Sequence, residues 1–202
     1  MAQLKTFVFD FDGVLCHDKF YHSELKDSFP NIVDWIQREI FGNRELVDSW
    51  MRGILKSNDI NRVIATNCGI DFALLDKMFR NSVRRMLLDV DLLTLILELK
   101  KVGYPLCLVT DNMDIFSEIT ITNLRLNKIF DVIVNSADYG FLKKERGGAL
   151  FDIALTQISC PIQETILIDD SLSTIEMYAN KGGQTFPYKN FESFNEFARN
   201  NF

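Results

Sequence analysis

The sequence predicts an α/β fold, a mostly parallel sheet with helices on both faces, together with a small all-helical domain. Two observations carry this prediction. Beyond Asp89, short apolar runs alternate with segments of helical periodicity, which is typical of strand-helix-strand units. From about Tyr21 to Leu88 the apolar residues recur at helical spacing and no convincing strand is found. We therefore expect a core formed by residues 1–15 and 89–202 and a helical insert over residues 16–88.

The first element is a strand from Leu4 to Phe9, since this apolar run is too short for a helix and ends at Asp10. Three segments of the insert place apolar residues on one helical face: 32–40, 46–55 and 75–86. Ser57-Asn58-Asp59 is typical of a turn or of the start of a helix. The insert is therefore expected to be a packed helical unit.

The second half of the chain repeats the strand-helix alternation. The expected strands are 106–109, 132–134 and 166–168, with a short edge strand at 184–187. The expected helices are 92–101, 115–126, 148–158, one ending near residue 181, and 191–199. Such an order predicts a Rossmann-like core.

Composition excludes several classes of protein. Hydrophobic residues make up 47% of the chain and charged residues 25%, which is ordinary for a globular protein. No apolar run is long enough for a membrane span and no signal-peptide pattern precedes the first strand, so we expect a cytoplasmic protein that does not bind membranes. The net charge is −6 and no basic stripe is present, which disfavours a nucleic-acid partner.

Four cysteines are scattered singly at positions 16, 68, 107 and 160. Without paired cysteines or nearby histidines, neither a disulfide framework nor a zinc site is expected. Cys16 follows the first acidic motif and could be a nucleophile, although no histidine is placed to activate it, so a packing role is favoured.

Two carboxylates, Asp10 and Asp12, follow the first strand and are separated by one residue. Ligands in open α/β sheets bind beyond the carboxyl ends of the strands, and carboxylates there can bind a hard cation. Gly13 allows a backbone turn that other residues resist. Taken alone, the same pattern is also compatible with a strand followed by an Asp-Gly turn.

Three further segments strengthen the interpretation of a site. An apolar run ends at Thr110-Asp111-Asn112, a loop after 132–134 carries Lys143 and Lys144, and another apolar run ends at Asp169-Asp170-Ser171. The first could be a routine turn and the last a helix cap. All four segments follow expected strands, which predicts that they meet at one edge of the sheet.

This ordered set, Asp-x-Asp-Gly, Thr, Lys and Asp-Asp, resembles the haloacid dehalogenase-like superfamily of hydrolases and phosphotransferases. The resemblance implies that Asp10 is a nucleophile that forms an aspartyl-phosphate and that Asp12 is the general acid and base. It implies Mg²⁺ bound by the Asp10 carboxylate, the Asp12 backbone carbonyl and the Asp170 carboxylate, with Asp169 nearby. It also implies that substrate phosphate is bound by Thr110, by the backbone N–H of Asp111 and by Lys143. The insert occupies the position of the family's helical cap.

The resemblance leaves several alternatives open. Lys144 stands where the family often has proline, so it competes with Lys143 for the site. The expected function is a Mg²⁺-dependent phosphatase for a small phosphorylated metabolite, acting as a monomer or homodimer. A phosphomutase would use the same residues, while a dehalogenase or a catalytically silent binding module is less favoured. His17, Lys19 and His22 could reach substrate or be exposed loop residues; Trp35 and Trp50 are more compatible with core packing.

Overall fold

The computed structural model describes residues 5–201. Five strands form one sheet in the order β3-β2-β1-β4-β5, and every neighbouring pair is parallel. The strands are β1 (Thr6–Phe9), β2 (Leu106–Thr110), β3 (Val132–Asn135), β4 (Thr165–Asp169) and β5 (Gln184–Pro187). The predicted α/β fold is confirmed, and each predicted strand is present within a residue or two of its expected ends. Leu4, the predicted start of the first strand, lies outside the described residues.

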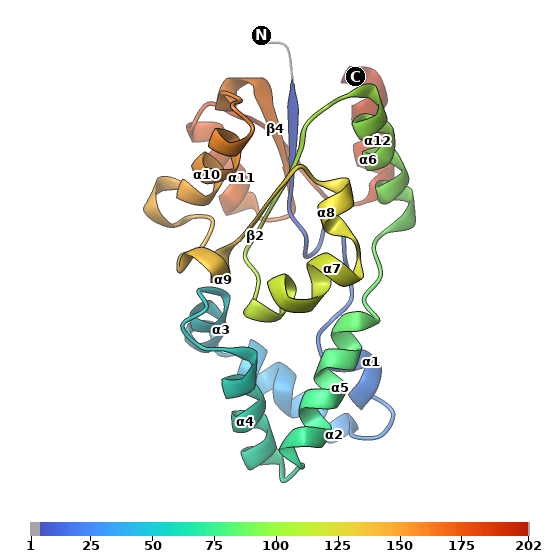
Figure 1. Cartoon of the computed structure of the whole chain (residues 1–202), viewed down its shortest axis with the longest axis vertical. Helices are drawn as coiled ribbons and strands as arrows, with labels where there is room; N and C mark the ends of the chain where they lie inside the picture. The colour runs from blue at the N-terminus through green and yellow to red at the C-terminus, as the bar shows by residue number, and fades with distance from the viewer. Residues whose placement is uncertain (1–4, 202) are drawn as a thin grey trace.

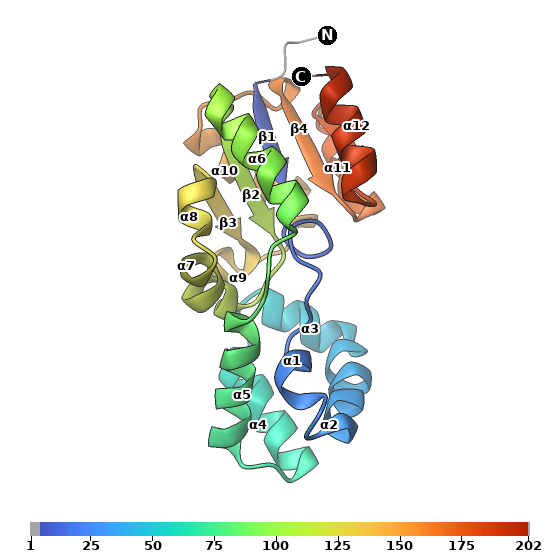
Figure 2. The same ribbon diagram turned by 90° about the vertical axis from the view of Figure 1, so that its right-hand side faces the viewer.

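Helices cover both faces of the sheet (Figures 1 and 2). Side chains alternate along β1, so that Phe7 and Phe9 enter one apolar cluster and Val8 enters another. On the Val8 side the sheet packs against α10 (Ala149–Gln157) and α11 (Leu172–Asn180). The opposite face is covered by α6 (Val90–Val102), α8 (Leu126–Ile129) and α12 (Phe191–Asn201). Strands buried on both faces explain the near-continuous apolar runs in the sequence.

Residues 16–88 contain helices and no strand, and we call them the helical module. Its elements are α1 (His22–Leu25), α2 (Pro30–Trp35), the π-helical segment η1 (Ile36–Phe41), α3 (Arg44–Met51), α4 (Ser57–Cys68) and α5 (Phe72–Arg84). Trp50 is fully buried and packs against Phe20 and Phe79. Trp50 therefore lies in the core of the module, and α4 begins at Ser57, which is one of the two alternatives that Ser57-Asn58-Asp59 left open.

The helical module lies beyond the carboxyl ends of the strands (Figure 1). Two chain segments connect it to the sheet, and they are hydrogen-bonded to each other. The backbone N–H of Asp89 donates to the carbonyl of Leu15 at 2.9 Å, and the N–H of Leu87 donates to Asp18 Oδ2 at 2.8 Å. The module therefore faces the strand ends, where the acidic motifs lie.

Two local expectations were correct only in part. The predicted helix 115–126 is a π-helical segment, η2 (Phe116–Thr120), that continues into α7 (Ile121–Asn123); Arg125 then adopts a φ of +53° before α8 begins. The predicted loop before Lys143 contains a single helical turn, α9 (Ser136–Tyr139), and short 3₁₀ turns follow at η3 (Glu145–Gly147) and η4 (Ile162–Glu164). Within residues 5–201, no helix combines the length and apolar character needed to cross a membrane.

Candidate active site

Three central strands bring the sequence motifs to one edge of the sheet. In register, Phe9 of β1 lies beside Leu108 of β2 and Ile168 of β4. Asp10 and Asp169 come directly after Phe9 and Ile168, and Thr110 is the last residue of β2, so the three residues converge at the carboxyl ends of neighbouring strands. The chain runs from β1 to β2 on one side, and only later returns to β4 on the other. Crevices at such a reversal of strand order are where ligands bind in open α/β sheets.

Lys143 joins these motifs. Its Nζ lies 2.7 Å from Asp10 Oδ2 and 2.8 Å from Asp169 Oδ2, and its backbone N–H donates to Asp111 Oδ1 at 2.7 Å. Lys143 is buried, whereas the neighbouring Lys144 is exposed and donates to Ser173 Oγ at 2.9 Å. The structure thus brings Lys143 to Asp10 and Asp169 and directs Lys144 away from them.

Carboxylate oxygens of Asp10, Asp169 and Asp170 lie within 4.8 Å of one another. We call these three residues the acidic cluster. Asp10 and Asp170 were predicted as metal ligands, and Asp169 joins them as a third carboxylate. The Asp12 side chain is not part of this group; it accepts a hydrogen bond from Asn112 Nδ2 at 2.8 Å, and the sequence prediction assigned only its backbone carbonyl to the metal.

Gly13 allows Asp170 to approach the first motif. Its φ is +76°, and a Cβ atom at this position would collide with the Asp170 carboxylate. Asp169 is held from the other side, because its Oδ1 accepts the backbone N–H of Ser171 at 2.8 Å. The acidic cluster is therefore fixed by the turns after β1 and β4.

The charges of the site are unbalanced in the described structure. Lys143 is the one ammonium in ion-pair contact with the acidic cluster among residues 5–201. Burial raises the pKa of Asp10 to about 7, against the attraction of Lys143. Burial alone would lower the pKa of Lys143, but Asp10, Asp169 and Asp111 raise it, so Lys143 stays protonated. A hard divalent cation would supply the missing positive charge, and carboxylate oxygens are its preferred ligands.

Asp12 borders the open space above the cluster. Desolvation by the surrounding protein, opposed by Lys143 and reinforced by Asp170, raises its pKa to about 7. A carboxyl that titrates near neutral pH can both give and accept a proton. Its hydrogen bond from Asn112 holds it in place, and the sequence prediction did not assign a role to Asn112.

Thr110 ends β2 and is fully buried. Its Oγ1 has no hydrogen-bond partner among residues 5–201. A buried hydroxyl without a partner is costly, so this hydroxyl is available to a ligand oxygen. Asp111 is bound to the backbone of Lys143, and burial raises its pKa.

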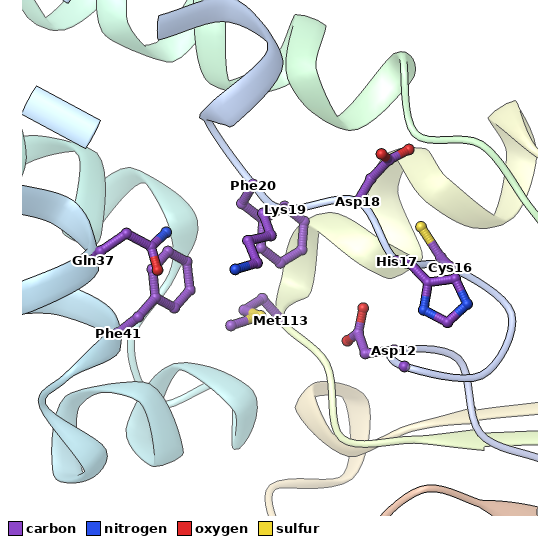
Figure 3. A pocket seen from close by; sticks show the side chains of 10 residues that line it. Asp12, Cys16, His17, Asp18, Lys19, Phe20, Gln37, Phe41 and Met113 are labelled. Atoms are coloured by element: carbon purple, nitrogen blue, oxygen red, sulfur yellow. The ribbon is translucent and has the colours of Figure 1, made fainter. Parts of the chain in front are cut away.

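A cleft of about 410 Å³ opens beside Asp12 (Figure 3). It lies between the turn after β1 and the helical module, and its lining includes His17, Lys19, Gln37 and Phe41. Cys16 also borders the cleft, but it is buried, and this burial raises its pKa to about 12. Its thiol is therefore a poor nucleophile at neutral pH, in agreement with the packing role favoured from the sequence.

A sequence model described as haloacid dehalogenase-like hydrolase matches residues 4–182. The chain belongs to this hydrolase family. The family assignment agrees with the resemblance drawn from the four motifs, and it extends through the helical module to the glycine that follows α11. No curated protein sequence matched the chain.

Solved structures of this hydrolase family share the fold over nearly the whole chain. The HAD family enzyme bt-2542 from Bacteroides thetaiotaomicron is 19% identical with a TM-score of 0.76, covering 98% of this chain and 99% of that one. A predicted HAD-like family hydrolase from Porphyromonas gingivalis is 18% identical with a TM-score of 0.75 and the same coverage. L-2-haloacid dehalogenase from Xanthobacter autotrophicus is 14% identical with a TM-score of 0.69, covering 99% of this chain and 84% of that one. The bt-2542 enzyme has also been solved with magnesium and inorganic phosphate.

Proposed function

We propose that this hydrolase is a Mg²⁺-dependent phosphatase for small phosphorylated metabolites. The observation that carries the proposal is the position of Lys143, whose ammonium contacts both Asp10 and Asp169. The carboxylates of the acidic cluster outnumber this one positive charge and would be neutralised by a further cation. Phosphate esters resist attack by an anion unless positive charge offsets the repulsion. The magnesium and phosphate bound by bt-2542 support the same reaction class for this chain.

The acidic cluster fits Mg²⁺ because all of its side-chain donors are carboxylate oxygens. Asp10 and Asp170 would hold the ion together with the carbonyl of Asp12, and Asp169 would lie beside it. When bound, the ion would neutralise charge on the phosphoryl oxygens. Lys143 would add a second positive charge, and Thr110 Oγ1 would donate to a phosphoryl oxygen.

The reaction would proceed in two displacements. An oxygen of Asp10 attacks phosphorus while the bond from phosphorus to the ester oxygen breaks, and Asp12 gives its proton to the departing alkoxide. Asp12 then accepts a proton from water, whose oxygen attacks the aspartyl-phosphate. Phosphate leaves and the Asp10 carboxylate is restored.

We further propose that residues 1–15 and 89–202 are the catalytic core and residues 16–88 a cap. Linkers near Leu15 and Asp89 join the two parts, and the cleft lies between them. Asp12 favours ester hydrolysis over dehalogenation, because loss of halide needs no proton donor for a departing alcohol.

The test is phosphate release from a panel of phosphate monoesters with Mg²⁺, repeated with EDTA and with Asp10→Asn. We expect EDTA to abolish release and Asp10→Asn to lower kcat by a factor of about 10³ or more, since the nucleophile is lost. Equal phosphate release by the wild type and by Asp10→Asn would contradict the proposal. Halide release from 2-haloacids, without phosphate release from any ester, would indicate a dehalogenase instead.

A further inference from the structure

The cleft beside Asp12 has more room than a phosphoryl group requires. Its volume of about 410 Å³ is typical of pockets that hold whole small molecules. Phe20, Phe41 and Met113 supply apolar walls, and Lys19 and Gln37 supply polar groups. If phosphate is bound at the acidic cluster, this cleft holds the rest of the substrate, so its lining selects which ester is accepted.

Lys19 and Gln37 have unused hydrogen-bond donors. Neither the Lys19 ammonium nor the Gln37 amide has a hydrogen bond or ion pair within residues 5–201. In Figure 3 the nitrogen of Lys19 points toward the side of the cleft where Gln37 and Phe41 lie, and the amide of Gln37 points back toward Lys19. The two residues come from opposite sides of the cleft, the linker after β1 and the segment η1.

Nearby carboxylates do not neutralise Lys19. Asp18 accepts a hydrogen bond from the N–H of Leu87, and its carboxylate points away from Gln37 in Figure 3. Asp12 accepts from Asn112. Asp34 borders an adjoining hollow that Lys19 and Gln37 also line, but it forms no ion pair with Lys19 in the described structure. A positive charge and an amide donor thus remain available above an apolar wall.

From this arrangement we infer that the cleft selects phosphate esters that carry a carboxylate, separated from the phosphoryl group by an apolar body, with Lys19 and Gln37 binding the carboxylate. The inference rests on the proposed phosphatase function. One ammonium and one amide match the single charge and two oxygens of a carboxylate. A second phosphate group would carry about twice the charge and would need more donors. Phe20, Phe41 and Met113 would contact the apolar body.

The test measures binding without turnover. Benzylphosphonate and 4-carboxybenzylphosphonate are titrated calorimetrically, with Mg²⁺ present, into the wild type and into Lys19→Met. We expect the wild type to bind the carboxylated compound about fivefold more tightly, the upper end of what one exposed ion-pair contact contributes. Lys19→Met should remove this preference and Lys19→Arg should retain it.

Lys26→Met is the matched control, because Lys26 is an exposed lysine of the same module that does not line the cleft. Lys26→Met should keep the fivefold preference of the wild type, and all variants should keep the thermal midpoint of the wild type. Equal binding of the two phosphonates by the wild type, no binding of either, or an undiminished preference in Lys19→Met would overturn the inference. Tighter binding of p-xylylenediphosphonate than of the carboxylated compound would overturn the choice of carboxylate. Failure of phosphate release would instead count against the proposed reaction.

Discussion

Lys143 and Lys144 are adjacent in the chain but have different surroundings. Lys143 is buried between Asp10 and Asp169, and Lys144 is exposed beside Ser173. We predict that Lys143→Met lowers kcat for phosphate esters by a factor of about 10²–10³, the usual cost of removing a charge that stabilises the transition state. Lys144→Met should stay within about twofold of the wild type. Steady-state kinetics of both variants decide the matter, and a large loss confined to Lys144→Met would reverse the assignment.

The close approach of Gly13 to the Asp170 carboxylate can be tested by one substitution. Gly13→Ala should destabilise the fold and weaken Mg²⁺ binding, because the added Cβ meets the Asp170 carboxylate. Gly69→Ala is the matched control: its φ is +65° and a Cβ there meets nothing within 4 Å. The control should cost about 1–2 kcal/mol from the left-handed backbone alone. Urea unfolding and Mg²⁺ titration compare them, and equal effects in both measurements would contradict the clash.

The sequence could locate the acidic residues and, through the family resemblance, favoured Lys143, but it left Lys144 open as a competitor for the site. Asp10 and Asp169 directly follow apolar runs, and parallel strands place such residues at one edge. The direction of Lys143 depends instead on the turn α9 and on Gly140, whose φ is +83°. Asn112 could not be assigned for a similar reason: its bond to Asp12 joins residues 100 positions apart.

The junction between α4 and the loop after β2 holds the helical module on the sheet. Asp114 accepts hydrogen bonds from the backbone N–H of Ser57 at 3.1 Å, from Ser57 Oγ at 2.6 Å and from Trp50 Nε1 at 3.1 Å. We predict that Asp114→Ala lowers the free energy of unfolding by about 2–3 kcal/mol, because the buried Ser57 and Trp50 side chains lose a charged acceptor. The measurement is urea unfolding.

Glu118→Ala is the control for this junction. Glu118 also crosses from the sheet side to the module, pairing with Arg80 at 3.3 Å, but its side chain is 53% exposed. Exposed ion pairs contribute about 0–1 kcal/mol, so this variant should stay close to the wild type. If Asp114→Ala were no more destabilising than Glu118→Ala, the junction would not stabilise the module.

Element boundaries were predictable where helical or strand periodicity is strong and caps are clear. The helix predicted over 92–101 is α6; it begins two residues earlier, after Asp89, whose side chain accepts the N–H of Leu92, and it ends before Gly103, whose φ is +102°. The segment 115–126 has the same apolar spacing, yet its hydrogen bonds follow a π-helical pattern and Arg125 turns left-handed. No glycine or proline in this segment indicates either change, so the local sequence predicted one continuous helix.

The chain as a whole carries a net charge of −6, and part of that negative charge is concentrated at the ends of β1 and β4. Asp10, Asp12, Asp169 and Asp170 face a single contacting ammonium, Lys143, within the described residues. The desolvation that raises the pKa of Asp10 and Asp12 opposes their ionisation. Folding therefore brings together carboxylates whose mutual repulsion a divalent cation would relieve.

Because such a cation would bind the folded chain and not the unfolded one, Mg²⁺ should stabilise the whole molecule. At a concentration 100 times its dissociation constant, a ligand of the folded state adds about 2.7 kcal/mol, which for a chain of this length raises the thermal midpoint by about 5–10 °C. Calorimetric scans in MgCl₂, and in NaCl of equal ionic strength, measure this shift. Asp170→Asn removes one carboxylate of the acidic cluster and should abolish most of it. An equal rise in NaCl would show a nonspecific effect of salt and contradict the prediction. An unchanged rise in Asp170→Asn would show that Mg²⁺ binds outside the acidic cluster.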